Sequence, residues 1–511
     1  MDEPLAIRRL IVDVQHQVLG VADRLHSSPA QDLVTTAFAA ELEQQDALFE
    51  GIGLADIAHT IMLIEAGVIP ADEGATLLSF LLKLQPRPRD FVPDPALGDM
   101  YTNREAWLSA RTAATGWLGA GRARREATTT GYLFATRWRL LEMIGALIEA
   151  GRAIVGSAER HRDSLMPDYT YLQASQPTTF AHFLLGFGCA LMRDLDRARA
   201  LFGRINLSPA GCGSSNGSTL PQDRERLAAL LGFDGLIRHA RDAMWEADLP
   251  IEALGVATAA LVNLDRLAED LMIFSTAEFG FVELSDAHAR TSKLMPQKKN
   301  PFALGYIRAV ANKLIGVQTA MAVCGRTPTG QMDNRLQPNG DVPGALGAAA
   351  GAAKLMGESI VGLTFDHSRA RHALDSSFAC ATDLAELIMT KAGVDFRTAH
   401  RLIARLTRDM IDKGARSFRM TNGDLDAVAS AMIGRPLGLV QQQLDEAADP
   451  AVAVSRRTGI GGAARKAVSA MIHECRDGLA GHAQWQTDTS SRLAASEKAL
   501  LALAERMAEG N

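Results

Sequence analysis

Glu252–Phe279, EALGVATAALVNLDRLAEDLMIFSTAEF, is the stretch of this 511-residue chain that decides its fold class. Apolar residues recur along it three or four positions apart: Leu254, Ala257, Leu261, Leu264, Ala268 and Leu271. Charged Arg266, Glu269 and Asp270 fall between them, as a partly solvated face requires. This spacing predicts the apolar seam of a long helix in a bundle.

A second stretch, Gly344–Leu363 (GALGAAAGAAKLMGESIVGL), is rich in glycine and alanine. Small residues let helix backbones approach closely, so we predict a buried helix in a crowded bundle, where the glycines lower its intrinsic stability. The rest of the chain is also dominated by helix-forming residues. Its length suggests three domains, or one large assembly with a long shared core.

Composition narrows the class of protein. Hydrophobic residues make up 47% and charged residues 22%, which is ordinary for a globular enzyme and excludes a disordered chain. The net charge of −6 weighs against a nucleic-acid partner. Five scattered cysteines without a CxxC pair indicate a reducing compartment. The first residues, MDEPLAIRRL, lack the apolar stretch of a signal peptide, and we expect no membrane span and a cytoplasmic protein.

The most unusual local sequence is Arg290–Pro301, RTSKLMPQKKNP. A basic surface loop is the ordinary interpretation of such a segment. Two features argue against it here, because the loop follows a core-like helix and because Met295 and Pro296 are placed among the charges. Nearby lysines stabilise a serine alkoxide and a carboxylate that gains charge, so Ser292 becomes a candidate base.

The MPQKKNP run resembles the signature loop of the fumarase/aspartase superfamily, most of all that of its argininosuccinate lyase branch. The resemblance implies that Ser292, three residues before Met295, is the catalytic base. It also implies that Lys298 and Asn300 stabilise the developing charge, while Lys299 is a solvated neighbour. The family loop usually reads Gly-Ser-Ser; Thr291 and Lys293 here flank the retained serine.

Other segments extend the resemblance over roughly residues 30–470 and leave about 40 residues as a C-terminal extension. Asp56–His59 (DIAH) resembles an early SIAH segment, and DMYTNRE at Asp99–Glu105 resembles a His-x-Asn segment. In the latter, Tyr101 takes the place of the histidine and Asn103 is kept.

Two further segments carry residues of the implied site. GRARRE at Gly121–Glu126 resembles the GRSRND segment that grips the succinyl carboxylates; Arg124 is kept, and Arg125 replaces an asparagine. MPDYTYLQASQP at Met166–Pro177 resembles MPGYTHLQRAQP. Thr170 is kept there, but Tyr171 replaces a histidine that serves as a general acid or orienting group. Taken alone, Tyr171 is more often a core phenol.

The resemblance implies an all-α fold of three mainly helical domains: 1–110, a central long-helix bundle over 111–365, and 366–511 with the extension. It also implies a homotetramer in which three chains share each active site. Ser292, Tyr171, Lys298 and Asn300 are then the expected catalytic residues. The expected substrate-binding residues are Arg124, Arg125, Thr170, Asn103, Lys293 and Gln331.

We expect neither a cofactor nor a metal. His367 and His372 are five positions apart, which places them off one helix face, and no cluster of cysteines and histidines exists in the sequence. Gly211–Gly217 (GCGSSNG) lacks the Lys-Ser/Thr that would follow it in a phosphate loop.

The departures from the family pattern bear on the substrate. Arg125 and Lys293 add positive charge, which disfavours the guanidinium of argininosuccinate and favours extra carboxylates. The loop Thr327–Leu336 (TPTGQMDNRL), which contains Gln331, also departs from the family's YNKDLQ. We therefore expect a C–N lyase that releases fumarate from an N-substituted aspartate with an anionic or neutral amine half.

Aminopolycarboxylic acids such as ethylenediamine-disuccinate, which a lyase of this branch cleaves, are the substrate type we expect, and amine addition to fumarate is the possible reverse reaction. Two alternatives stay open. One is an argininosuccinate lyase with a divergent site. The other is an inactive, crystallin-like structural relative, against which the retention of Ser292, Lys298 and Asn300 counts.

Overall fold

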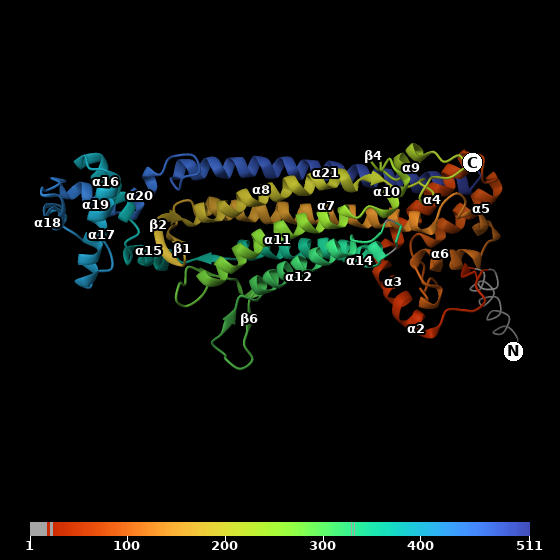
Figure 1. Cartoon of the computed structure of the whole chain (residues 1–511), viewed down its shortest axis with the longest axis horizontal. Helices are drawn as coiled ribbons and strands as arrows, with labels where there is room; N and C mark the ends of the chain where they lie inside the picture. The colour runs from red at the N-terminus through yellow and green to blue at the C-terminus, as the bar shows by residue number, and fades with distance from the viewer. Residues whose placement is uncertain (1–17, 21–23, 329, 332, 511) are drawn as a thin grey trace.

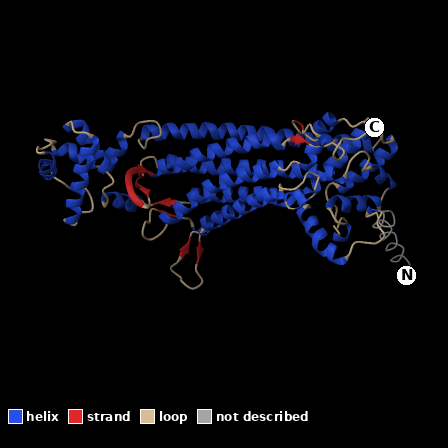
Figure 2. Cartoon of the chain, in the orientation of Figure 1, coloured by secondary structure: helices blue, strands red, loops and turns tan. Residues whose placement is uncertain are grey.

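The computed structural model describes residues 18–20, 24–328, 330–331 and 333–510. The first 17 residues of the expected N-terminal domain therefore lie outside the described residues. Figure 1 shows an elongated molecule with a bundle of long helices between two smaller helical units. The prediction of a mainly helical protein with a central long-helix bundle is confirmed, since strands form only short pairs (Figure 2).

The N-terminal unit is built from short helices around α4, and its core continues into that of the bundle. Its elements are α2 (Gln31–Leu33), the π-helical turn η1 (Val34–Phe38), α3 (Ala39–Gln44), η2 (Asp46–Leu48), α4 (Phe49–Glu65), α5 (Ala71–Leu84), η3 (Pro95–Leu97), α6 (Met100–Ser109) and η4 (Ala113–Trp117).

Five long helices form the bundle: α7 (Arg124–Arg160), α8 (Phe180–Ile205), α11 (Asp248–Phe274), α12 (Phe302–Cys324) and α14 (Pro338–Val361). Shorter elements connect them at both ends: β1 (Leu165–Thr170), β2 (Gln173–Thr179), β3 (Leu207–Ser208), α9 (Arg224–Leu230), β4 (Gly235–Leu236), α10 (Ala240–Trp245), β5 (Val282–Glu283), η5 (Asp286–His288), β6 (Arg290–Thr291), β7 (Lys299–Asn300), α13 (Asp333–Leu336) and β8 (Thr364–Phe365).

The predicted seam helix is α11, although its bounds differ from the expected 252–279. The hydroxyls of Ser275 and Thr276 donate to the carbonyls of Met272 and Ile273, both at 2.8 Å, which ends the helix. The chain then turns back, so that Phe281 N donates to Phe274 O at 2.9 Å. The sequence pattern extends past the true end because these aromatic residues pack beside the helix instead of continuing it.

The glycine- and alanine-rich stretch lies in α14, and it packs closely on α7 as expected. A Cβ on Gly357 would lie 3.2 Å from the Cα of Ala150 in α7, tighter than most such contacts. The helix begins earlier than predicted, at Pro338, and carries Pro343 within its first turns. Gly344 and Gly351 face outward, so the helix is buried on one side only in this protomer.

The C-terminal range 366–511 divides into two parts by its packing. A compact unit with its own core comprises α15 (His367–Asp375), α16 (Ala381–Ala392), α17 (Phe396–Asp412), α18 (Asn422–Ile433), α19 (Gln441–Ala448) and α20 (Pro450–Arg456). The remaining helix, α21 (Arg465–Ala508), runs back along α7 and α8 to the N-terminal unit (Figure 1). The expected extension thus makes up most of a helix that spans the bundle.

Among the described residues, Asp46–Glu65 is one segment long and apolar enough to cross a membrane by length and composition alone. In the fold, 83% of its most apolar window is buried inside the protein, where it forms the core helix α4.

Two glycines set the crossing of α4 and α7, which joins the N-terminal unit to the bundle. A Cβ on Gly131 would lie 3.0 Å from the backbone nitrogen of Ile52, and one on Gly51 would lie 2.8 Å from the Cα of Gly131. Both contacts involve backbone atoms, which cannot move aside as a flexible side chain could.

We therefore expect Gly131→Ala to lower the free energy of unfolding by about 1–3 kcal/mol, measured by urea denaturation. Gly203→Ala is the matched control, because Gly203 lies in α8 with open space around its Cβ position. That change should be neutral or stabilise by about 0.5–1 kcal/mol. Equal effects of the two changes would show that the crossing is not limited by backbone contact.

Candidate active site

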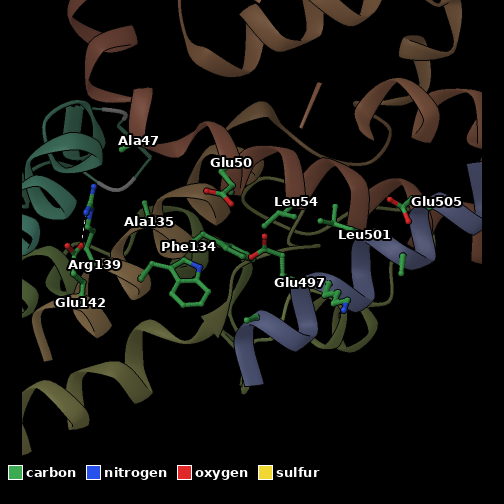
Figure 3. A pocket seen from close by; sticks show the side chains of 15 residues that line it. Ala47, Glu50, Leu54, Phe134, Ala135, Arg139, Glu142, Glu497, Leu501 and Glu505 are labelled. Carbon is green, nitrogen blue, oxygen red and sulfur yellow. Dashed lines mark hydrogen bonds and ion pairs between the residues drawn. The ribbon is translucent and has the colours of Figure 1, made fainter. Parts of the chain in front are cut away.

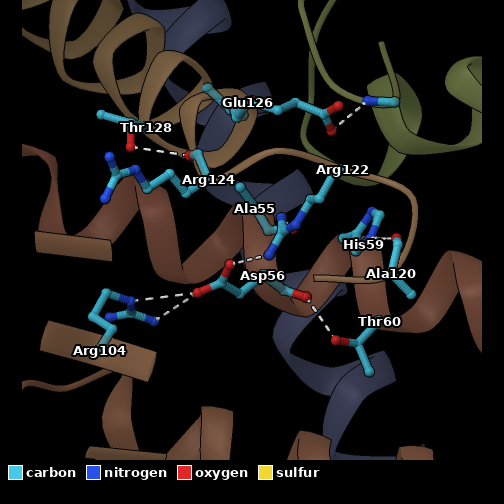
Figure 4. Close-up of polar contacts among 12 residues, drawn as sticks. Ala55, Asp56, His59, Thr60, Arg104, Ala120, Arg122, Arg124, Glu126 and Thr128 are labelled. Carbon is cyan, nitrogen blue, oxygen red and sulfur yellow. Dashed lines mark hydrogen bonds and ion pairs between the residues drawn. The ribbon is translucent and has the colours of Figure 1, made fainter. Parts of the chain in front are cut away.

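The turn that leads into α7 is held by a buried carboxylate between two buried arginines (Figure 4). Asp56, in α4, accepts from Arg122 through one oxygen and from Arg104 through the other, the latter at 3.4 Å. All three side chains are almost fully buried. Burial lowers the pKa of the Arg104 guanidinium, and the Asp56 charge partly offsets that effect. Within the protomer, the DIAH segment therefore supports the GRARRE turn.

The same turn is fixed from its other side by Glu126. Its carboxylate accepts from the backbone N–H groups of Gly211 at 2.7 Å and Gly213 at 2.6 Å. Both glycines have φ near +75°, and a Cβ on Gly213 would meet the carbonyl oxygen of Gly217 at 2.7 Å. The amide groups of this loop therefore bind a carboxylate of the protein itself.

Arg124 begins α7 and leaves the turn with a half-exposed guanidinium. It forms an ion pair with Asp99 at 3.1 Å and donates to the hydroxyl of Thr102 at 3.5 Å. Asp99 is buried and caps α6 by accepting from Thr102 N at 2.8 Å. The arginine that we expect to hold a succinyl carboxylate is therefore oriented by an acid that the sequence analysis did not single out.

Asn103, the second expected ligand of this region, has a carboxamide that is buried and occupied. Its Nδ2 donates to the carbonyls of Gly98 and Asp99, and its Oδ1 accepts from Asp94 N at 2.7 Å. In this protomer the side chain holds the loop before α6. Nearby Tyr101 is also buried, and its ring faces the Arg122 guanidinium at 5.7 Å.

Arg125 points toward the loop that contains Gln331. Its guanidinium donates to the side-chain oxygen of Asn334 in α13 at 2.7 Å and to the carbonyl of Met244 at 3.3 Å, and it lies over the Trp245 ring. Gln331 itself is exposed, and its backbone N–H donates to Pro328 O at 3.3 Å. The structure thus brings the GRARRE turn and the 327–336 loop together within one chain.

These elements enclose a cavity of about 140 Å³ at the start of α7. Three arginines line it, and the full set is Glu41, Gln45, Asp99, Arg124, Arg125, Thr128, Thr129, Arg335, Leu336 and Asn339. Arg335 is not among the residues predicted from the sequence, where its only signal is its place in a loop that departs from the family pattern.

Thr170 and Tyr171 lie at the tip of the β1–β2 hairpin. Tyr171 and Leu172 form its two-residue turn with φ of +53° and +56°, a conformation that ordinarily selects Asn or Gly. Tyr171 is 100% exposed, so no contact within the protomer favours this strained turn. The hairpin is anchored below its tip by Tyr169, whose ring packs on Phe279 at 5.3 Å.

Ser292 lies in a loop whose ends pair as the short strands β6 and β7. Its Oγ accepts from the backbone N–H groups of Met295 at 3.0 Å and Leu294 at 3.3 Å. Lys293 and Lys298 are exposed, and Asn300 is partly exposed. Lys299, expected to be solvated, is exposed and forms surface ion pairs with Glu283 and Asp286, each at 2.8 Å. The serine oxygen is therefore held by two donors on a loop that also carries exposed cations.

The expected site residues form three groups on elements toward opposite ends of the bundle (Figure 1). Asn103 lies in α6, and Arg124 and Arg125 begin α7, at the N-terminal end, whereas the β1–β2 hairpin and the loop that starts with β6 lie toward the other end. A single chain does not bring these groups together. In the described part of the chain, no three His, Cys, Asp or Glu side chains gather as a metal site would require.

A cavity of about 900 Å³ lies outside all three groups, between α4, α7 and α21 (Figure 3). Its apolar wall includes Phe134 and Trp138, and its rim carries Glu50 and Glu497. No expected site residue contributes to it.

Known protein families and known proteins resemble this chain over most of its length. Residues 97–316 match the lyase family model, and residues 378–455 match that of the argininosuccinate lyase C-terminal region. The argininosuccinate lyase of Methanococcoides burtonii is 31% identical over 467 residues, which cover 90% of this chain and 93% of that protein.

Two solved structures share the whole architecture. The crystal structure of EDDS lyase in complex with formate is 28% identical with a TM-score of 0.86, and the match covers 94% of this chain and 97% of that one. A variant of EDDS lyase with bound fumarate is 27% identical with a TM-score of 0.83, with the same coverage.

The Asp56 network allows a direct test of the support under Arg124. Asp56→Asn keeps the shape but removes the charge between two buried guanidiniums, and we expect a loss of about 3–5 kcal/mol in unfolding free energy. Asp46→Asn is the control, because Asp46 pairs with Arg87 at 2.5 Å in an exposed setting. Its loss should stay below about 1 kcal/mol. Similar small losses for both variants would mean that the buried network does not hold the turn.

Proposed function

Because the chain belongs to the argininosuccinate lyase branch of the fumarase/aspartase superfamily, whose relatives here are C–N lyases, we propose that it eliminates an amine from an N-substituted aspartate and releases fumarate. The fumarate bound to the EDDS lyase variant supports the proposed product. The substrate class we favour is the aminopolycarboxylic acids, with an anionic or neutral amine half.

The observation that carries the proposal is the setting of Ser292. Two backbone N–H groups donate to its Oγ, and hydrogen bonds to a charged form favour that form. The exposed Lys293 and Lys298 add positive charge on the same loop. A serine in this setting ionises more easily than a free one and can act as a base.

Ser292 takes the proton from the succinyl carbon beside one carboxylate, and that carboxylate then carries two negative charges. Lys298 and Asn300 stabilise this charge, while Arg124 and Thr170 hold the succinyl group. The electron pair forms the carbon–carbon double bond as the C–N bond breaks. The amine leaves with the bond's electrons and takes up a proton, for which Tyr171 is the proposed donor or orienting group.

The site we propose is assembled from three chains of a homotetramer. Support comes from apolar side chains that the protomer leaves in solvent. Leu294, beside the serine, is 85% exposed. The bundle helix α12 exposes Phe302, Tyr306 and Val323 along its length. Large exposed apolar surface of this kind marks a contact with another chain.

The second candidate is argininosuccinate cleavage, which the name of the relative from Methanococcoides burtonii favours. Against it stand the added cations Arg125 and Lys293, which would repel a guanidinium. Fumarate release, followed by its ultraviolet absorbance on a panel of N-substituted aspartates that includes argininosuccinate, separates the candidates. An inactive, crystallin-like relative would release none from any substrate.

Ser292→Ala tests the base. We expect the tetramer to persist and turnover to fall at least about a hundredfold, the low end for loss of a positioned base. Ser79→Ala, which removes an exposed hydroxyl on α5, should leave turnover unchanged. Turnover of Ser292→Ala within a few-fold of the unchanged protein would remove this serine from the mechanism.

Tyr171→Phe tests the phenol at the strained turn. A phenol, with an unperturbed pKa near 10, matches an alkylamine leaving group better than an imidazole does. We expect a loss of about 2–4 kcal/mol in transition-state stabilisation if the phenol is the acid, and about 1 kcal/mol if it only orients the substrate. The readout is kcat/KM for fumarate release.

Tyr169→Phe is the matched control, two residues earlier on the same hairpin, where the ring packs on phenylalanines. It should retain full activity. Unchanged kinetics in both variants would remove the Tyr171 hydroxyl from the mechanism. A gain of argininosuccinate cleavage in Tyr171→His would instead favour the second candidate.

A further inference from the structure

The cavity at the start of α7 holds a buried cation that the protomer does not neutralise. Arg335, in α13, is only 5% exposed and lines this cavity. Its Nε and Nη1 are buried without a hydrogen-bond partner among the described residues. Its charge lies over the Tyr132 ring at 5.2 Å, and that ring supplies no acceptor oxygen to these nitrogens. Buried donors and charges left in this state are costly unless something pairs with them.

Of the two acids that line the cavity, one already pairs with an arginine and the other has a raised pKa. Asp99 pairs with Arg124. Glu41 accepts from Gln45 at 3.2 Å, and burial together with the charge of Asp99 raises its pKa. Three arginines thus line the cavity against two acids, so the lining itself carries an excess of positive charge. Asp333, which is not part of that lining, also acts on Arg125 through its charge.

Glu246 is a further acid on which the charge of Arg335 acts. Burial raises its pKa to about 7 even though the Arg335 charge acts in the opposite direction. Arg335 acts on the Glu246 carboxyl through its charge alone, and not through a hydrogen bond, within the described residues, while the charges of Asp248, Asp242 and Glu252 act in the opposite direction. This acid therefore does not neutralise the arginine at close range.

Arg125 and Arg335 are close enough to act on one anion. Arg125 donates to Asn334, the residue before Arg335, at 2.7 Å. Burial, and next the like charge of Arg335, lowers the pKa of Arg125 to about 10. Two guanidiniums that repel each other across a small cavity are both relieved by an anion placed between them.

We propose that Arg335 and Arg125 form a subsite for a carboxylate carried by the amine half of the substrate, beside the succinyl-binding Arg124. This inference rests on the proposed function and specifies its substrate class. The cavity's 140 Å³ is several times the roughly 30 Å³ that a water occupies in the liquid, which suits one carboxylate on a short arm. A cationic or purely alkyl amine half would leave the Arg335 donors unpaired.

The test compares two substrates of similar size that differ in one carboxylate. N-(carboxymethyl)aspartate would release glycine, and N-propylaspartate would release propylamine. We expect the first to have the higher kcat/KM, by about tenfold to a hundredfold, mainly through KM, as for one charge-assisted contact in a buried site. This comparison uses the unchanged protein, so it does not depend on a variant folding.

Arg335→Gln should remove most of that preference by weakening only the carboxylated substrate, and Arg335→Lys should restore part of it. Arg139→Gln is the control, because Arg139 is an exposed α7 arginine paired with Glu142 at 2.6 Å. It should change neither substrate.

Binding without turnover separates this inference from the proposed function. In a Ser292→Ala background, calorimetry should show tighter binding of the carboxylated compound, and Arg335→Gln should abolish the difference. Fumarate release from both compounds at equal kcat/KM would overturn the subsite and leave the lyase function standing. Absence of turnover with both, together with retained selective binding, would overturn the proposed reaction and leave the subsite standing. Equal binding of both compounds would also overturn the subsite.

Discussion

The pairing of the buried Asp56 carboxylate with Arg104 and Arg122 is the interaction on which the turn before α7 and the start of that helix depend. A buried carboxylate is tolerated only when it is paired, and here each of its oxygens has a guanidinium partner. Because the three charges belong to α4, α6 and the turn before α7, their pairing fixes three segments at one point. Arg124 and Arg125 follow closely after Arg122, so their positions are set by a group that never needs to touch a ligand.

A second constraint acts at the opposite end of the bundle. Two exposed segments there have conformations that no contact within the protomer explains. Tyr171 and Leu172 occupy the left-handed region although neither residue prefers it. The serine loop exposes Leu294 while its backbone amides are turned inward onto Ser292. Both features are accounted for by the proposed assembly of chains, where the apolar side chains are covered and the polar ones meet Arg124 of another copy.

The sequence predicts helix identity well and helix limits poorly, for physical reasons visible in α11 and α21. The seam of α11 follows from its three- and four-residue spacing. Its end does not, because the stop is made by Ser275 and Thr276 hydroxyls, and the following aromatic residues keep the composition apolar. The path of α21 back along α7 and α8 is set by tertiary packing, which the local spacing of apolar residues does not encode.

For the site, the motif residues are found by their neighbours along the chain, which is why Ser292 and Arg124 can be named from the sequence alone. Their separation within a protomer cannot be predicted from the same motifs. The supporting acids Asp99 and Glu126 are missed for a different reason: their roles depend on which amide groups and cations surround them after folding. Asp99 could have been suspected as a helix cap, since it directly precedes the α6 residues.

Two buried arginines show how a structural cation differs from one that awaits a partner. Arg137 is sandwiched between Phe134 and Phe233, and its two terminal nitrogens donate to Asn206 and to the carbonyl of Leu231. Burial still lowers its pKa, to about 9, although the fold supplies an acceptor to each of its two terminal nitrogens. Arg335 is also deeply buried, but its charge faces a cavity and its Nε and Nη1 have no acceptor among the described residues. Removing Arg137 would leave acceptors of the protein unpaired, whereas Arg335 leaves its own donors unpaired until something enters. The first arginine thus serves the folded chain, and the second has donors that the proposed carboxylate would satisfy.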